Sequence, residues 1–252
     1  MQTSVQLHLL LLLVSPGLGL EDECRQATEE LSPVHHLYAE DGLEVTKIAF
    51  SSCHLPEEMS SVSNFWSDVR YMTSPDVFLW LGDNMYQDGE DINAKRRAYN
   101  RVREERQYRE EGPVSESKGK IPVMATWDDH DYGYNNAGSE YQCKAESQAE
   151  WANHFNIPVS QPQHPASPHY RPGVYNARMF LKPGQDREEG VHVIMLDARS
   201  ARDPTYSSFG ACRGSHTGIL SETQWSWLEE ELDKKSEIKV IGSGIQASSS
   251  PV

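Results

Sequence analysis

The sequence lacks several features that mark common protein classes. It has four cysteines in 252 residues, no Cys-x-x-Cys pair and no Asn-x-Ser/Thr acceptor, so neither a disulfide framework nor N-glycosylation is expected. Basic residues are scarce, and the formal net charge is −15. That charge argues against nucleic-acid binding through phosphate contacts. It is compatible with bound cations, and also with plain solubility.

Long apolar runs are also missing. The run Leu7–Val14 is too short to span a bilayer, and no later segment approaches about 18 apolar residues. Pro16 follows this run, and Gly17 and Gly19 supply the small residues that a signal peptidase reads. We therefore expect residues 1–19 to be a signal peptide, rather than a buried helix, and the mature protein to be secreted with no transmembrane segment.

The cysteines allow a simple prediction about pairing. Cys53 lies at the end of an apolar run among polar residues, and a cysteine that binds metal there is a thiolate and cannot pair. Three others remain after signal removal: Cys24, Cys143 and Cys212. One disulfide and one free thiol are expected among them, with the partners left open.

Short apolar runs alternate with helical patterns, which predicts an α/β fold. After a polar lead-in at 20–45, one domain is expected over residues 46–246, followed by a divergent tail at 247–252. Strands are expected at Lys47–Ser52, Val77–Leu81, Ile121–Thr126, Gly173–Leu181, Val191–Asp197 and Ile238–Ile245. Helices are expected at Met59–Met72, Asp91–Glu111, Ala145–Phe155 and from Ser221 to about Ser236.

Three of the apolar runs end in residues that commonly bind metals. They read KIAFSSCH (47–54), VFLWLGDNMY (77–86) and IPVMATWDDHDYG (121–133). Open α/β sheets place their sites beyond the carboxyl ends of parallel strands. One such run has ordinary explanations, whereas three together predict a metal-dependent active site. Its candidate residues are Cys53, Asp83, Tyr86, Asp128, Asp129, His130 and Asp131.

The chemistry of the second run suits a metal centre. Gly82 allows a sharp turn that directs Asp83 into the crevice, where a carboxylate can bridge two cations. A phenolate from Tyr86 suits a hard trivalent ion such as Fe³⁺ better than Zn²⁺. The alternative is an Asx-turn beside a packed tyrosine.

The third run is more specific. Three carboxylates in four residues repel one another unless cations neutralise them, and they favour a protonated His130 that can serve as the acid for a leaving alkoxide. A solvated acidic loop is the alternative. Downstream, Arg199 or Arg202 can clamp a phosphate, or can form an ordinary salt bridge.

These motifs resemble alkaline phosphatase D, the PhoD-like metallophosphatases. The resemblance covers about Thr46–Gln246 and rests on FSSC, WLGDNMYQD, ATWDDHDYG, LDAR and the stretch GILSETQWSWLEEELDKKSEIKVIGSGIQ. It implies a calcineurin-like fold, a double β-sheet sandwich flanked by helices. It also implies a secreted phosphomonoesterase and phosphodiesterase whose site holds iron (Fe³⁺) and calcium (Ca²⁺), acting on a small-molecule or lipid phosphate ester.

The resemblance assigns roles to individual residues. Cys53, Asp83 and Tyr86 match the iron ligands, and Asp83 would also bridge to calcium. Asp129 stands where broader metallophosphatases carry a ligating asparagine, and His130 stands at the place of the catalytic histidine. The neighbouring polar residues expected to contact substrate are Asn84, Asp128, Asp131 and Arg199.

One family feature is missing. The remaining ligands of the family lie downstream of the Gly-Ile-Gln strand in a Gly-Asp-x-His motif, and no such motif follows Gln246. We expect a C-terminally truncated or alternatively spliced member with an incomplete fold, poorly stable and nearly inactive. Two functions stay open: an active phosphoric ester hydrolase, or an impaired form that binds metal or phosphate without catalysis.

Overall fold

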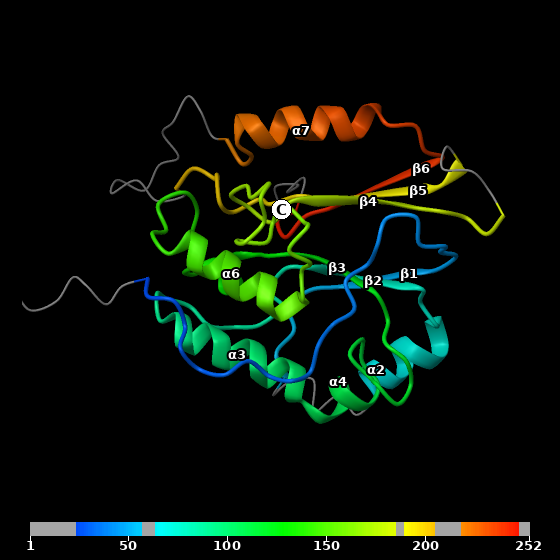
Figure 1. Cartoon of the computed structure of the whole chain (residues 1–252), viewed down its shortest axis with the longest axis horizontal. Coiled ribbons are helices and arrows are strands. Elements are labelled where there is room, and N and C mark those ends of the chain that lie inside the picture. Colours follow the sequence, from blue (N-terminus) through cyan, green and yellow to red (C-terminus); the bar gives the residue numbers. More distant parts are fainter. Residues whose placement is uncertain (1–23, 57–63, 185–188, 205–217, 247–252) are drawn as a thin grey trace, which may run out of the picture.

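Two small β-sheets face each other in the centre of the molecule, with helices on both outer sides (Figure 1). This is seen in a computed structural model, which describes residues 24–56, 64–184, 189–204 and 218–246. The first sheet is parallel and contains β1 (Ile48–Ser51), β2 (Val77–Leu81) and β3 (Val123–Thr126). The second sheet is mixed and contains β4 (Asn176–Phe180), β5 (Val191–Met195) and β6 (Ile238–Gly242). The expected α/β class is confirmed.

The strands β2, β3 and β5 are largely apolar and buried on both faces, because each sheet is covered on both sides there. In β2, Val77 and Leu79 face the second sheet, whereas Phe78 and Trp80 face the helices. The layer between the sheets is built by nine buried residues: Ala39, Val45, Val77, Leu79, Met124, Phe180, Val191, Val193 and Met195. This packing brings the ends of β3 and β5 together, and Thr126 Oγ1 donates a hydrogen bond to the Leu196 carbonyl at 2.6 Å.

Helices cover the two outer faces. The described helices are α2 (Phe65–Asp68), the π-helix η1 (Val69–Thr73), α3 (Ile92–Glu104), α4 (Arg106–Glu110), α5 (Asp129–Tyr132), α6 (Lys144–Phe155) and α7 (Glu222–Asp233). Figure 1 shows α7 over the second sheet, while α2, α3, α4 and α6 lie on the side of the first sheet. None of the described helices is both long and apolar enough to cross a membrane.

The prediction of a single helix over Asp91–Glu111 is wrong. The chain forms two helices that break at Glu105, whose backbone is extended (φ −55°, ψ 134°). The Glu105 carboxylate then caps α4 by accepting hydrogen bonds from the backbone N–H groups of Gln107 and Tyr108. The break turns Tyr108 into the core, where it is fully buried. The helix predicted from Met59 is described only from Phe65, where one α-helical turn passes into η1.

The lead-in is tied to the rest of the molecule. A disulfide joins Cys24 to Cys143, which confirms one predicted disulfide and identifies its partners. Ser32 N–H donates to Asn100 Oδ1 on α3, and single β-bridges join Tyr38 to Val123 and Glu44 to Leu181. The predicted signal peptide, the tail at 247–252 and Cys212 lie outside the described residues.

Candidate metal centre

The parallel strands of the first sheet bring the predicted ligands to one end. β1 leads to Cys53 and β2 leads to Asp83, and two backbone hydrogen bonds hold these ends together. Cys53 N–H donates to the Gly82 carbonyl at 3.1 Å, and His54 N–H donates to the Asp83 carbonyl at 2.8 Å. Because β3 pairs with β2, the segment that follows it lies at the same end.

The backbone at these strand ends is strained. Cys53 (φ 58°) and Asp83 (φ 50°) both adopt the left-handed region, which non-glycine residues rarely occupy. Gly82, at φ 105°, lies against the next strand end, since a Cβ there would be 2.7 Å from Asp128 Cβ. The sharp turn expected at Gly82 is therefore present. Strain of this kind gathers at functional sites, where the surrounding structure holds it in place.

A thiol, a carboxylate and a phenol meet at Asp83. Tyr86 Oη donates to Asp83 Oδ2 at 3.2 Å, and Cys53 Sγ lies 3.8 Å from the same oxygen. Burial raises the pKa of the Asp83 carboxyl, and the charge of Asp129 raises it further. Burial also raises the pKa of the Tyr86 phenol, as does its hydrogen bond with Cys53. The carboxyl and the phenol would ionise more readily beside a cation, and Cys53 adds a sulfur donor, so this donor set fits a metal ion.

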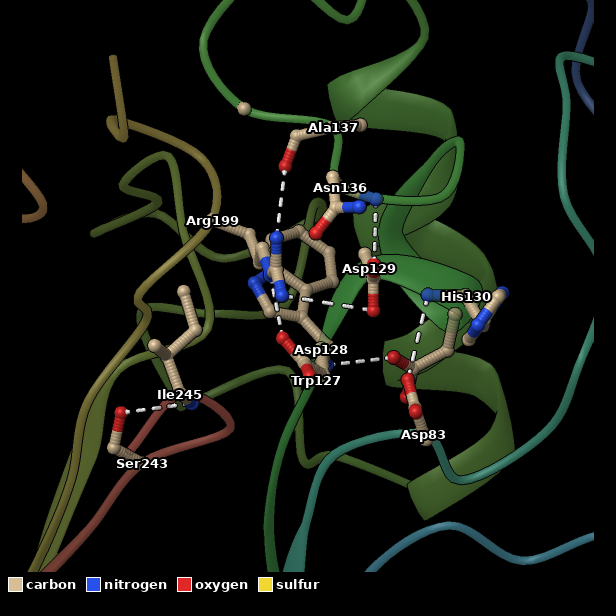
Figure 2. A network of polar contacts seen from close by, with 12 residues as sticks. Asp83, Trp127, Asp128, Asp129, His130, Asn136, Ala137, Arg199, Ser243 and Ile245 are labelled. Atoms are coloured by element: carbon tan, nitrogen blue, oxygen red, sulfur yellow. Dashed lines mark hydrogen bonds and ion pairs between the residues drawn. The ribbon is translucent and has the colours of Figure 1, made fainter. Parts of the chain in front are cut away.

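Asp129 and His130 complete the cluster. One potential ligand atom from each of Asp83, Asp129 and His130 lies within 4.8 Å of the other two. Asp129 Oδ2 accepts a hydrogen bond from the Asn136 N–H at 2.6 Å, which fixes the carboxylate in place (Figure 2). Two buried carboxylates this close repel each other, and a shared cation relieves that repulsion.

His130 is held by a residue that sequence reasoning did not single out. Its Nδ1 lies 2.6 Å from Asp88 Oδ1, and its ring packs against Tyr86 with centroids 4.6 Å apart. Burial lowers the pKa of His130, but the bond to Asp88 and the charge of Asp83 outweigh burial, and the net shift is upward. The only signal for Asp88 in the sequence is a carboxylate five residues after Asp83.

Asn84 and Asp131 lie in the interior rather than on the surface of the site. Asp131 is fully buried, and its Oδ1 accepts from the Asp128 N–H at 2.7 Å. Its Oδ2 accepts from the backbone and side-chain N–H groups of Asn84. Asn84 Nδ2 also donates to the Thr126 carbonyl at 2.8 Å. The two side chains thus join the loop after β2 to the loop after β3.

The sequence predicts either phosphate binding or a salt bridge for Arg199, and in the structure Arg199 forms ion pairs. Its Nε contacts Asp128 Oδ1, and its Nη2 lies 3.6 Å from Asp129 Oδ1 (Figure 2). Burial raises the pKa of Asp128 to about 6, although the hydrogen bond from Arg199 opposes the shift. Arg202 lies close by, and its Nη1 is buried without a hydrogen-bond partner in the described structure.

Asp197 binds the backbone of Arg199 and is itself held by α7. The buried Asp197 carboxylate accepts hydrogen bonds from Trp127 Nε1 at 2.7 Å and from the Arg199 N–H at 3.0 Å. Gln224, in the first turn of α7, accepts a hydrogen bond from the Asp197 N–H and donates one to the Asp197 carbonyl, both at 2.9 Å. The loop after β6 closes against the same strand end, since a Cβ on Gly244 would be 2.6 Å from the Trp127 carbonyl.

Comparisons with known proteins bear on the fold and the family. The solved "Structure of PhoD" superposes with a TM-score of 0.57 at 17% sequence identity, covering 79% of this chain and 41% of that one. The chain therefore spans about two-fifths of the length of that protein. No curated protein matches the sequence. The family model described as PhoD-like phosphatase matches residues 48–250. The chain belongs to the PhoD-like phosphatase family.

Proposed function

We propose that this protein is a secreted, metal-dependent phosphoric ester hydrolase with a calcineurin-like sandwich. The proposal rests on the meeting of Asp83, Asp129 and His130 at the ends of β2 and β3, with Cys53 and Tyr86 against Asp83. Family membership supports the reaction class. The substrate is a phosphomonoester or phosphodiester, either a small molecule or a lipid.

The residues at the strand ends suit two kinds of cation. Cys53, Asp83 and Tyr86 would hold Fe³⁺, because a thiolate and a phenolate suit that ion. Asp83 and Asp129 would hold Ca²⁺, which prefers carboxylate oxygens. When bound, such cations supply Lewis acidity toward the phosphoryl oxygens and the attacking water.

The side chains of this chain do the proton transfer and bind the substrate. Asp88 engages His130 Nδ1, which orients the ring and leaves Nε2 to donate a proton to the leaving alkoxide. Arg202, whose Nη1 has no hydrogen-bond partner among the described residues, would bind a phosphoryl oxygen. Arg199 contributes its charge through Asp128 and Asp129.

A second function has one specific observation in its favour. The Arg199 guanidinium is already paired with Asp128, so the cation best placed to clamp a phosphate is occupied. A protein that binds metal or phosphate without turning substrate over fits that arrangement.

The test combines metal content with turnover. Protein produced with iron and calcium should retain iron, show a phenolate-to-iron absorption band, and hydrolyse a chromogenic phosphate ester. Asp83→Asn should lose metal and turnover, whereas His130→Gln should keep metal and lose about 10²-fold in kcat for an alkyl phosphate ester, whose leaving oxygen needs a proton. Glu116→Gln is the control, because Glu116 is exposed and pairs with Lys120. Metal without turnover would favour the binding protein, and a protein with neither would refute both the hydrolase and the metal-binding alternative.

A further inference from the structure

A buried lysine lies behind the candidate site without a carboxylate partner in the described structure. Lys95, on α3, is 0% exposed, and its Nζ donates one hydrogen bond, to the Gln87 carbonyl at 3.1 Å. Burial lowers the pKa of this amine to about 8, while the charges of Asp131 and Asp88 oppose the shift. Burying an ammonium group is costly, so a buried lysine with this single contact calls for an explanation.

The carbonyl that Lys95 binds belongs to the turn that carries Asp88. Tyr141 Oη donates to the Gly89 carbonyl, on the other side of Asp88, at 3.0 Å. Lys95 Nζ also lies 5.7 Å from the centre of the Tyr141 ring. Together, Lys95 and Tyr141 hold the carbonyl groups of the two residues on either side of Asp88.

Asp88 needs such support because its own side chain is 45% exposed. An exposed carboxylate samples several rotamers, whereas orienting His130 requires one of them. The donors that fix the turn come from two separate elements, α3 and the loop before α6. Neither Lys95 nor Tyr141 is among the residues that would hold metal or substrate.

We propose that Lys95 and Tyr141 are positioning residues, which hold the Gln87–Gly89 turn so that Asp88 meets His130 Nδ1. This rests on the proposed function, in which His130 protonates the leaving group. The Lys95 ammonium is suited to the role because its charge also lies near the negative charges of Asp88 and Asp131.

Turnover of two phosphate esters with different leaving groups tests the role. An alkyl ester needs its leaving oxygen protonated, whereas a 4-nitrophenyl ester does not. Lys95→Met and Tyr141→Phe should each lower kcat about tenfold or more for the alkyl ester and less than about threefold for the nitrophenyl ester. Asp88→Asn should show the same selectivity. The double variant Asp88→Asn with Lys95→Met should have nearly the same kcat as Asp88→Asn alone, because both residues act through the contact between Asp88 and His130.

A matched control and a second readout separate positioning from general damage. Lys118→Met removes an exposed lysine with a similar ring contact, 5.6 Å from the Tyr71 centroid, and should change neither ester. In metal-free protein, the His130 ring N–H proton should give a downfield NMR signal that weakens in Lys95→Met and in Tyr141→Phe. Tyr141→Phe carries the test if Lys95→Met does not fold.

Several results would overturn the proposal. Equal losses for the two esters, additive losses with Asp88→Asn, or an unchanged His130 signal would each rule out a positioning role. A wild-type protein without turnover refutes the hydrolase function instead. In that case the NMR comparison still decides whether Lys95 and Tyr141 orient Asp88 toward His130.

Discussion

At the scale of single residues, Gly82 decides whether the ends of β2 and β3 can meet. Its φ of 105° lies in a region that side chains rarely adopt, and a Cβ would be 2.7 Å from both Cβ and N of Asp128. The next residue is Asp83, on which the thiol and phenol converge. The geometry of the metal centre therefore depends on the absence of a side chain at Gly82 and on its left-handed backbone conformation.

Gly82→Ala should lower the free energy of unfolding by about 2 kcal/mol or more, since backbone strain adds to overlap with Asp128. Urea unfolding and iron content per chain measure the two effects. Gly119→Ala is the matched control, with φ 82° and nothing within 4 Å of the added Cβ. It should cost about 1 kcal/mol, from the left-handed backbone alone. Equal losses at the two glycines would contradict this account.

The residues that sequence analysis identified share a simple property. Asp83 lies two residues after β2 and His130 lies four residues after β3, and parallel strands end on one side of a sheet, so their meeting could be predicted. Asp88 and Lys95 could not be, because neither directly follows a strand. Their importance depends on contacts with His130 and Gln87 that only the folded loop creates.

At the scale of elements, the strands were predicted better than the helices. Buried strands are marked by continuous apolar runs, which is a local signal. The break at Glu105 is accompanied by the burial of Tyr108, and the charged pattern of the segment indicates neither. The attachment of the lead-in was also missed, because its partners Asn93 and Asn100 lie far along the chain.

Among the contacts of the lead-in, the Cys24–Cys143 disulfide is expected to contribute most to the free energy of unfolding. Cys24 and Cys143 are 119 residues apart, so opening the bond releases a long loop in the unfolded chain. The double variant Cys24→Ser with Cys143→Ser should lose up to about 4 kcal/mol of unfolding free energy. Thermal melts with and without reductant measure it. Reductant should lower the Tm of the wild type and leave the Tm of the variant unchanged. If reductant did not change the Tm of the wild type, the disulfide would not stabilise the fold.

At the scale of the whole molecule, three buried histidines link the lead-in, the first sheet and the helices. His36 Nδ1 lies 2.8 Å from the His154 carbonyl, and its Nε2 lies 2.6 Å from Tyr108 Oη. Burial lowers the pKa of His36 to about 3 and that of His54 to about 4, and it lowers the pKa of His154 strongly. These histidines are therefore neutral in the folded protein.

The consequence is that each of these histidines weakens the fold in mild acid. The unfolded chain binds protons at these histidines below their ordinary pKa of 6.5, whereas the folded chain does not, so stability falls as pH falls. Asp128 acts in the opposite direction, because its raised pKa makes the folded state take up a proton near pH 6. The raised pKa values of Asp83 and Asp131 act in the same direction as that of Asp128, so the contribution of one histidine is measured by comparing variants.

His36→Asn should make stability less sensitive to acid. Between the pKa of the folded state and that of the unfolded state, each buried histidine lowers the free energy of unfolding by up to about 1.4 kcal/mol for each pH unit of acidification. Removing His36 should therefore remove about that much of the stability loss between pH 6 and pH 5. Urea unfolding of metal-free protein at several pH values measures the slope. His35→Asn is the control, because His35 is exposed beside His36 and should leave the slope unchanged. An identical slope in the two variants would show that the acid sensitivity arises elsewhere.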